Sequence, residues 1–110
     1  PALPARSFNE CQADPNFGSA ANYPVNIVQI DDKAETVTLA NVSPDPIDLG
    51  GWIMCSIGGN QRHDGVGGVL APGESRTFPY TGSGNSWLND GDDDGALYNQ
   101  NGQLVSYRND

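Results

Sequence analysis

Residues 51–57 have the sequence GWIMCSI, and the alternation within this stretch decides the fold class. Successive side chains of an extended strand point to opposite faces of its sheet. One face would therefore carry Trp52 and Met54. The other would carry Ile53 and Cys55. Because both faces are apolar, the pattern predicts a central strand that is buried on both sides.

Upstream of this strand, two segments rich in β-branched residues are separated by a short polar turn. They are VNIVQI at 25–30 and ETVTLAN at 35–41, with DDKA between them. This arrangement predicts a β-hairpin. The following stretch, SPDPIDLGG at 43–51, is predicted to be a loop, because its prolines and glycines cannot continue a ladder of hydrogen bonds.

Downstream, the chain alternates between glycine-rich loops and short strands. Residues 58–68, GGNQRHDGVGG, are irregular, whereas SRTFPY at 75–80 has the composition of a strand. The last two predicted strands, GALYN at 95–99 and QLVSY at 103–107, flank Asn101-Gly102. An Asn-Gly pair between two strand-like segments is a strong hairpin signal, because both residues accept positive φ.

The composition agrees with an all-β protein. The 110 residues include 14 glycines and 8 prolines, and helix-forming residues are sparse. Short strands joined by turns predict an antiparallel β-sandwich of six to eight strands, since a single sheet would leave one apolar face in water. The natural core candidates are Trp52, Phe78, Leu97 and Val105.

Residues 1–24 lack any strand or helix periodicity and contain four prolines, which predicts a linker-like arm preceding a domain at 25–110. The chain begins with Pro1 instead of Met, which indicates a processed or excised module of a larger multidomain chain. Cys11 lies in the arm and Cys55 in the central strand. Two cysteines in a small turn-rich domain predict a disulfide and an oxidising, extracellular setting, the alternative being two free thiols.

The charge restricts the class of partner. Fourteen acidic and five basic residues give a formal net charge of -9, which repels nucleic acid and favours metal cations or basic partners. The same charge also suits a protein that is simply adapted to a salty medium. No stretch approaches the about 18 apolar residues that insertion across a membrane requires.

Four motifs in order resemble those of the lamin tail domain. They are ETVTLANVS, then PIDLGGWIMCS with Leu49, Gly51 and Trp52, then VLAPGES with Leu70, Pro72, Gly73 and Glu74, and finally Trp87, Asn89 and Gly91 before GALYNQNGQLVSY. The likeness covers about residues 25–108 and departs from the family pattern at 58–68 and 90–94. It implies an immunoglobulin-like fold and, as in bacterial and archaeal extracellular members, a non-catalytic module that docks to a protein or cell-surface polysaccharide.

The acidic run at 90–95, DGDDDG, resembles the opening of a calcium-binding loop. Asp90, Asp92 and Asp94 occupy its positions 1, 3 and 5, but Asn101 stands at position 12, where the loop needs a glutamate. A calcium site of another type is one interpretation, and a solvated acidic loop is the other. No other cofactor is indicated.

Two further residues are candidates for function. Trp87 lies in a polar loop, where it would either bind a sugar or protein surface or cap the core. His63, beside Asp64, is the single histidine, and a hydrolase would need it near Ser56 or Cys55. The glycines around His63 instead predict an exposed loop histidine. The leading interpretation is a docking module; a calcium- or carbohydrate-binding module is the alternative, and a small hydrolase is a third.

Overall fold

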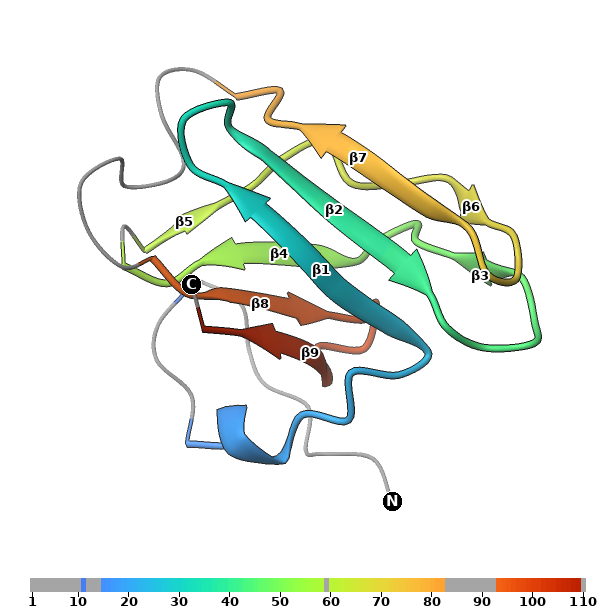
Figure 1. The fold of residues 1–110 in the computed structure, drawn as a ribbon. Helices are drawn as coiled ribbons and strands as arrows, with labels where there is room; N and C mark the ends of the chain where they lie inside the picture. Colours follow the sequence, from blue (N-terminus) through green and yellow to red (C-terminus); the bar gives the residue numbers. More distant parts are fainter. Residues whose placement is uncertain (1–10, 12–14, 59, 83–92, 110) are drawn as a thin grey trace.

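The computed structural model describes residues 11, 15–58, 60–82 and 93–109, which form an all-β domain (Figure 1). These residues contain nine strands, one 3-10 turn (η1, Phe17–Ser19) and no helix long and apolar enough to cross a membrane. The strands are β1 (Val25–Asp31), β2 (Thr36–Asn41), β3 (Ile47–Asp48), β4 (Ile53–Ser56), β5 (Gln61–Arg62), β6 (Val69–Leu70), β7 (Ser75–Pro79), β8 (Gly95–Tyr98) and β9 (Leu104–Arg108). The number of strands exceeds the six to eight expected from the sequence. The reason is that three two-residue strands, β3, β5 and β6, form within or beside segments whose sequence is typical of loops.

All pairings are antiparallel, and they divide the strands into three sheets. The orders are β1-β2-β7, β3-β6 and β5-β4-β8-β9. Strand β4 is an inner strand of the four-stranded sheet, with β5 on one side and β8 on the other. The predicted central strand is therefore confirmed. The predictions of an all-β class and of antiparallel pairing are confirmed as well.

The hairpin of β1 and β2 is closed by a side chain. The Oδ1 atom of Asp31 accepts hydrogen bonds from the backbone N–H groups of Lys33 (3.1 Å) and Ala34 (2.9 Å). Such an Asx-type turn gives the backbone a local partner where the ladder ends. Beyond it, Val37 pairs with Ile30 on β1. The predicted hairpin is confirmed.

The hairpin of β8 and β9 is also confirmed, although its turn differs from the expected one. Of the Asn-Gly pair, Gly102 has a positive φ of 77°. The Oδ1 atom of Asn99 accepts the backbone N–H groups of Asn101 (2.9 Å) and Gln103 (3.0 Å). A longer loop around a turn and a glycine with positive φ is a common hairpin connection. Asn99, the residue that follows β8, has the side chain that organises the turn.

The alternation along β4 divides its side chains between two apolar clusters. Met54 belongs to the main core, together with residues of all three sheets, and Cys55 belongs to a second cluster. The main core consists of Val25, Ile27, Ile30, Val37, Leu39, Leu49, Met54, Leu70, Phe78, Leu97 and Val105. Three of the four core candidates are in this list; the fourth, Trp52, is partly buried and packs against it.

The second cluster lies on the opposite face of the four-stranded sheet, where the N-terminal segment covers it. Cys11 forms a disulfide with Cys55 (Cα–Cα 5.4 Å), as the sequence predicts. Phe17 stacks on Tyr107 of β9 with ring centroids 4.2 Å apart. The backbone N–H of Asn22 donates to the carbonyl oxygen of Val105 (2.9 Å). The described residues before β1 thus pack against the sheet, below β8 and β9 in Figure 1.

The disulfide joins residues 44 positions apart, so it removes much of the freedom of the unfolded chain. We expect the double variant Cys11→Ala/Cys55→Ala to lose about 4 kcal/mol of unfolding free energy, measured by urea denaturation. The reduced wild-type chain should match the variant, and reductant should leave the variant unchanged. A loss below about 1 kcal/mol would show that packing alone holds the segment.

Candidate functional site

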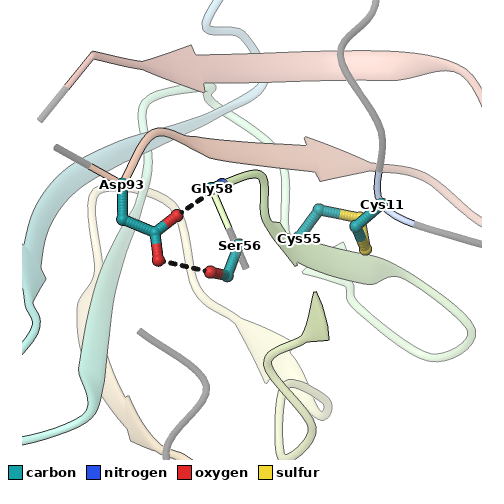
Figure 2. Close-up of a disulfide and its surroundings, with 5 residues drawn as sticks. All are labelled: Cys11, Cys55, Ser56, Gly58 and Asp93. Carbon is teal, nitrogen blue, oxygen red and sulfur yellow. Dashed lines mark hydrogen bonds between the residues drawn. A yellow bond between two sulfur atoms is a disulfide. The ribbon is translucent and has the colours of Figure 1, made fainter. Parts of the chain in front are cut away.

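The end of β4 holds a buried carboxylate. Asp93 is 1% exposed, and its Oδ2 atom accepts a hydrogen bond of 2.6 Å from the hydroxyl of Ser56. Its Oδ1 atom accepts the backbone N–H of Gly58 at 2.8 Å. Figure 2 shows that Ser56 binds Asp93 while its neighbour Cys55 binds Cys11. Through these two hydrogen bonds, this aspartate of the acidic run ties the start of β8 to the end of β4.

The next aspartate serves the same junction. The carbonyl oxygen of Asp94 accepts the backbone N–H of Ile57 (2.9 Å), and its Oδ2 atom accepts the hydroxyl of Tyr107. Burial, and then this hydrogen bond, raise the pKa of Tyr107 to about 12. Asp94 is therefore hydrogen-bonded to the side chain of Tyr107 on β9.

The other two predicted calcium ligands, Asp90 and Asp92, lie outside the described residues, and so does Trp87. Within the described part of the chain, no group of three or more His, Cys, Asp or Glu side chains is placed to hold a metal ion. Calcium binding by the acidic loop and ligand binding by Trp87 both stay predictions.

His63 is buried, and the expectation of an exposed loop histidine is wrong. Its side chain is 2% exposed, its Nε2 atom lies 2.9 Å from the carbonyl oxygen of Phe78, and its backbone N–H donates to Met54 (2.8 Å). The cause is β5, which pairs Arg62 with Cys55 of β4 and so carries the next residue inward. A two-residue strand among glycines has no periodicity that a sequence pattern can reveal.

Burial lowers the pKa of His63 from its ordinary value of 6.5. The carbonyl oxygen of Phe78 and the charges of Glu35 and Asp64 act in the opposite direction, but they are weaker than the loss of hydration. The imidazole is therefore held neutral in the folded protein at neutral pH. Its ring also lies beside Tyr80, with centroids 5.7 Å apart.

The residues that a hydrolase would use have structural partners here. Cys55 is in the disulfide, the hydroxyl of Ser56 donates to Asp93, and His63 contacts a main-chain carbonyl of β7. A nucleophile needs a hydrogen bond to its base. The base expected here was His63, but the hydroxyl of Ser56 donates its hydrogen bond to the buried carboxylate of Asp93.

A small pocket opens beside His63, with a volume of about 110 Å³. Its walls come from the start of β4, from β5 and from the loop that follows β5. The lining residues are Trp52, Ile53, Met54, Arg62, His63, Asp64, Gly65 and Val66. The Nε1 atom of Trp52 is buried and has no hydrogen-bond partner within the described part of the chain. Sequence reasoning placed Trp52 in the core and did not identify this pocket.

Asn41 begins a formal glycosylation motif, Asn41-Val42-Ser43, but its amide is part of the fold. The side chain is 1% exposed, and its Nδ2 atom donates to the carbonyl oxygens of Asp45 (2.7 Å) and Leu70 (3.0 Å). Its Oδ1 atom accepts the hydroxyl of Ser43 at 2.7 Å. Both amide hydrogens are engaged, so this nitrogen is not available for a glycan in the folded protein.

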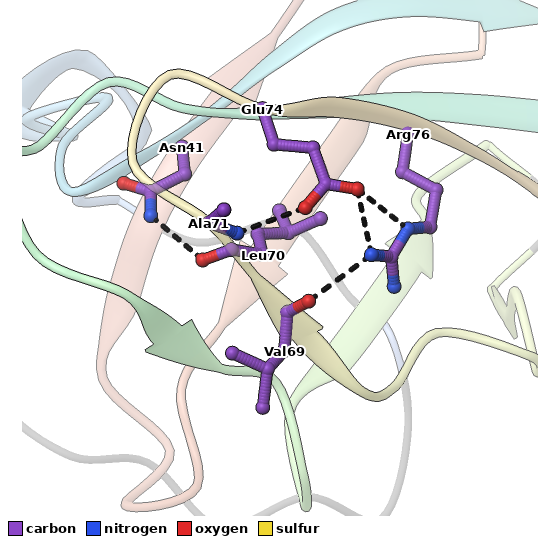
Figure 3. Close-up of polar contacts among 6 residues, drawn as sticks. All are labelled: Asn41, Val69, Leu70, Ala71, Glu74 and Arg76. Carbon is purple, nitrogen blue, oxygen red and sulfur yellow. Dashed lines mark hydrogen bonds and ion pairs between the residues drawn. The ribbon is translucent and has the colours of Figure 1, made fainter.

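The Pro-Gly turn after β6 is held by Glu74 (Figure 3). Its carboxylate accepts the backbone N–H of Ala71 (2.8 Å) and forms an ion pair with Arg76 (2.6 Å). The N–H of Ala71, followed by Arg76, lowers the pKa of Glu74. Arg76 also donates to the carbonyl oxygen of Val69 (3.1 Å), which connects β7 to β6.

Removal of the Ser56 hydroxyl should destabilise the fold. We expect Ser56→Ala to lower the unfolding free energy by about 1.5–3 kcal/mol in urea denaturation, because a buried oxygen of Asp93 loses a partner. Ser75→Ala, at an exposed position on β7, is the matched control and should change it by less than about 0.5 kcal/mol. Equal effects of the two substitutions would contradict the structural role of this hydrogen bond.

His63 should make stability depend on pH. Because its pKa is lower in the folded chain, the unfolded chain binds the proton first. The contribution of neutral His63 is complete above its ordinary pKa of 6.5 and is lost as pH falls through that value. The unfolding free energy, followed from pH 8 to pH 5, should decline more steeply in the wild-type chain than in His63→Gln. Parallel curves would show that His63 does not titrate differently on folding.

Comparison with known proteins finds no family model and no curated protein that matches the chain. The resemblance to the lamin tail domain accordingly rests on the motifs themselves.

Proposed function

We propose that the chain is a non-catalytic docking module of a secreted or cell-surface protein, with an immunoglobulin-like sandwich of the lamin tail type. Contacts between the edges of the two larger sheets support the sandwich. On one side, the backbone N–H of Ile27 on β1 donates to the Ser106 hydroxyl on β9 (3.0 Å). On the other side, the N–H of Thr81, just after β7, donates to the carbonyl oxygen of Asp64, just after β5 (3.0 Å).

The positions of the motif residues also support the family proposal. Leu49 and Leu70 are fully buried in the main core. Gly51 has a φ of 78°, and a Cβ atom there would lie 3.3 Å from the Cβ atom of Gln100 in the last hairpin. Gly73 has a φ of 77° in the turn closed by Glu74. These four motif residues thus have a backbone or packing reason for their identity.

The docking proposal rests on one observation: the side chains that could be reactive are bound to other groups of the fold. The two cysteines, the Ser56–Asp93 pair and the His63 imidazole all bind groups of the fold itself. These contacts build a rigid scaffold, and recognition is then left to the exposed surface. The disulfide favours an oxidising compartment such as the cell exterior.

An exposed apolar surface at the start of β1 suits such contacts. Tyr23 and Val42 are 52% and 50% exposed. They are brought near each other because the N–H of Val42 donates to the carbonyl oxygen of Pro24 (2.9 Å). Exposed aromatic residues are enriched in protein interfaces.

The test is binding of the fluorescently labelled, oxidised chain to envelope material of the organism that encodes it. We expect saturable binding that weakens at least about tenfold in Tyr23→Ser/Val42→Ser. Val28→Ser, at a partly exposed position further along β1, is the control and should bind like the wild-type chain. All three proteins are first compared by melting temperature. Absence of saturable binding by the wild-type chain would refute docking to this surface.

A further inference from the structure

The turn between β8 and β9 carries an exposed side-chain amide directly before a glycine. Asn101 is exposed, and it precedes Gly102, which has a φ of 77°. The backbone nitrogen that follows an asparagine can attack the side-chain carbonyl carbon, because the two atoms close a small, unstrained ring. Glycine has no side chain that would obstruct this approach. The pair therefore contains both partners of a reaction within the chain.

Other asparagines of the domain lack this combination. Asn41 is 1% exposed, and its Nδ2 atom donates to two main-chain carbonyl oxygens. The Oδ1 atom of Asn22 accepts the backbone N–H of Tyr107 (3.0 Å). A β-branched valine follows Asn41 and a tyrosine follows Asn22, and both side chains crowd the backbone nitrogen. The sequence contains a single Asn-Gly pair, and it lies in this exposed turn.

Asn99 holds the turn closed and so restrains the reaction. Its Oδ1 atom accepts the backbone N–H groups of Asn101 (2.9 Å) and Gln103 (3.0 Å). Its carbonyl oxygen accepts the N–H of Gly102 (2.9 Å), which contains the nitrogen that would attack. This nitrogen has to lose its proton before it can form a bond, and the hydrogen bond keeps the proton in place. The reaction consequently requires the turn to open.

We infer that Asn101 is a site of spontaneous covalent modification, where the chain converts an amide into a carboxylate at a rate that Asn99 controls. The nitrogen of Gly102 forms a bond to Cγ of Asn101. The bond between Cγ and Nδ2 breaks, and the nitrogen's proton passes through water to the departing ammonia. Water then opens the cyclic imide at one of its two carbonyl groups, which yields either aspartate or isoaspartate. Water is the co-reactant, and no atom is oxidised or reduced.

Both products change the last hairpin. Each adds a negative charge, and isoaspartate also lengthens the main chain within the turn. The turn is short and closely packed: the N–H of Asn99 donates to the carbonyl oxygen of Gln103 (3.0 Å), and a Cβ atom at Gly51 would lie 3.3 Å from Cβ of Gln100. A longer main chain cannot keep these positions. We therefore expect the isoaspartyl form, separated by its charge, to melt at a lower temperature than the unmodified chain.

The site is tested by following the oxidised chain at pH 8, with and without urea. Tandem mass spectrometry of proteolytic fragments locates the new acid, and enzymatic methylation detects isoaspartate. We expect conversion at position 101 in the folded chain, and conversion about tenfold or more faster in urea, where the hydrogen bonds of the turn are broken. If position 101 of the folded chain stays unmodified while the denatured chain converts completely, the proposal is overturned. Equal rates in the two states would overturn the control by the turn.

Two substitutions at Asn99 separate its positioning role from general stability. Asn99→Ala removes the acceptor oxygen, so the folded variant should convert position 101 about threefold to tenfold faster than the wild-type chain. Asn99→Asp retains an acceptor oxygen and should react no faster than the wild-type chain. In urea, Asn99→Ala and the wild-type chain should react alike, because the turn is open in both.

Melting temperatures establish first that each variant is folded. Equal rates for folded Asn99→Ala and the wild-type chain, or equal acceleration by Asn99→Ala and Asn99→Asp, would overturn the role of the Asn99 side chain. If Asn99→Ala does not fold, the comparison of the folded and denatured wild-type chain still decides whether the turn controls the reaction.

Discussion

Strand β4 has to bury both of its faces, because neither set of its alternating side chains is suited to water. Met54 enters the core shared by the three sheets, while Cys55 on the opposite face is bonded to Cys11. The second face is apolar and would be exposed if the four-stranded sheet ended the structure there. The N-terminal segment covers this face, because Phe17 and its neighbours pack against the sheet. The disulfide fixes that cover in place.

The same strand organises the polar interior. Ser56, the last residue of β4, binds the buried carboxylate of Asp93, and the main-chain carbonyl of Met54 accepts the N–H of His63. An unpaired polar group in a low-dielectric interior is costly, so each of these groups needs a specific partner. These contacts join segments that are distant in sequence. They position the short strand β5 and, with it, the walls of the pocket.

These internal contacts have consequences for function. Side chains that look reactive in the sequence are bound to the fold, whereas Tyr23 and Val42 remain exposed at the start of β1. Trp52 is an exception among the described residues, because its buried Nε1 atom has no hydrogen-bond partner there. The proposed docking surface follows from this division between bound and exposed side chains.

The sequence by itself determined the strands whose periodicity is local. The β1–β2 and β8–β9 hairpins, the two-sided burial of β4 and the Cys11–Cys55 bond were predictable, because alternation, turn residues and a pair of cysteines are visible in short stretches. Tertiary structure alone decided the burial of His63, the partners of Asp93 and the pocket beside Trp52. Each depends on which segments meet in space: Ser56 and Asp93 are 37 residues apart, and His63 and Phe78 are 15 apart. Local patterns specify which way a side chain points along a strand, but its partner is set by long-range packing.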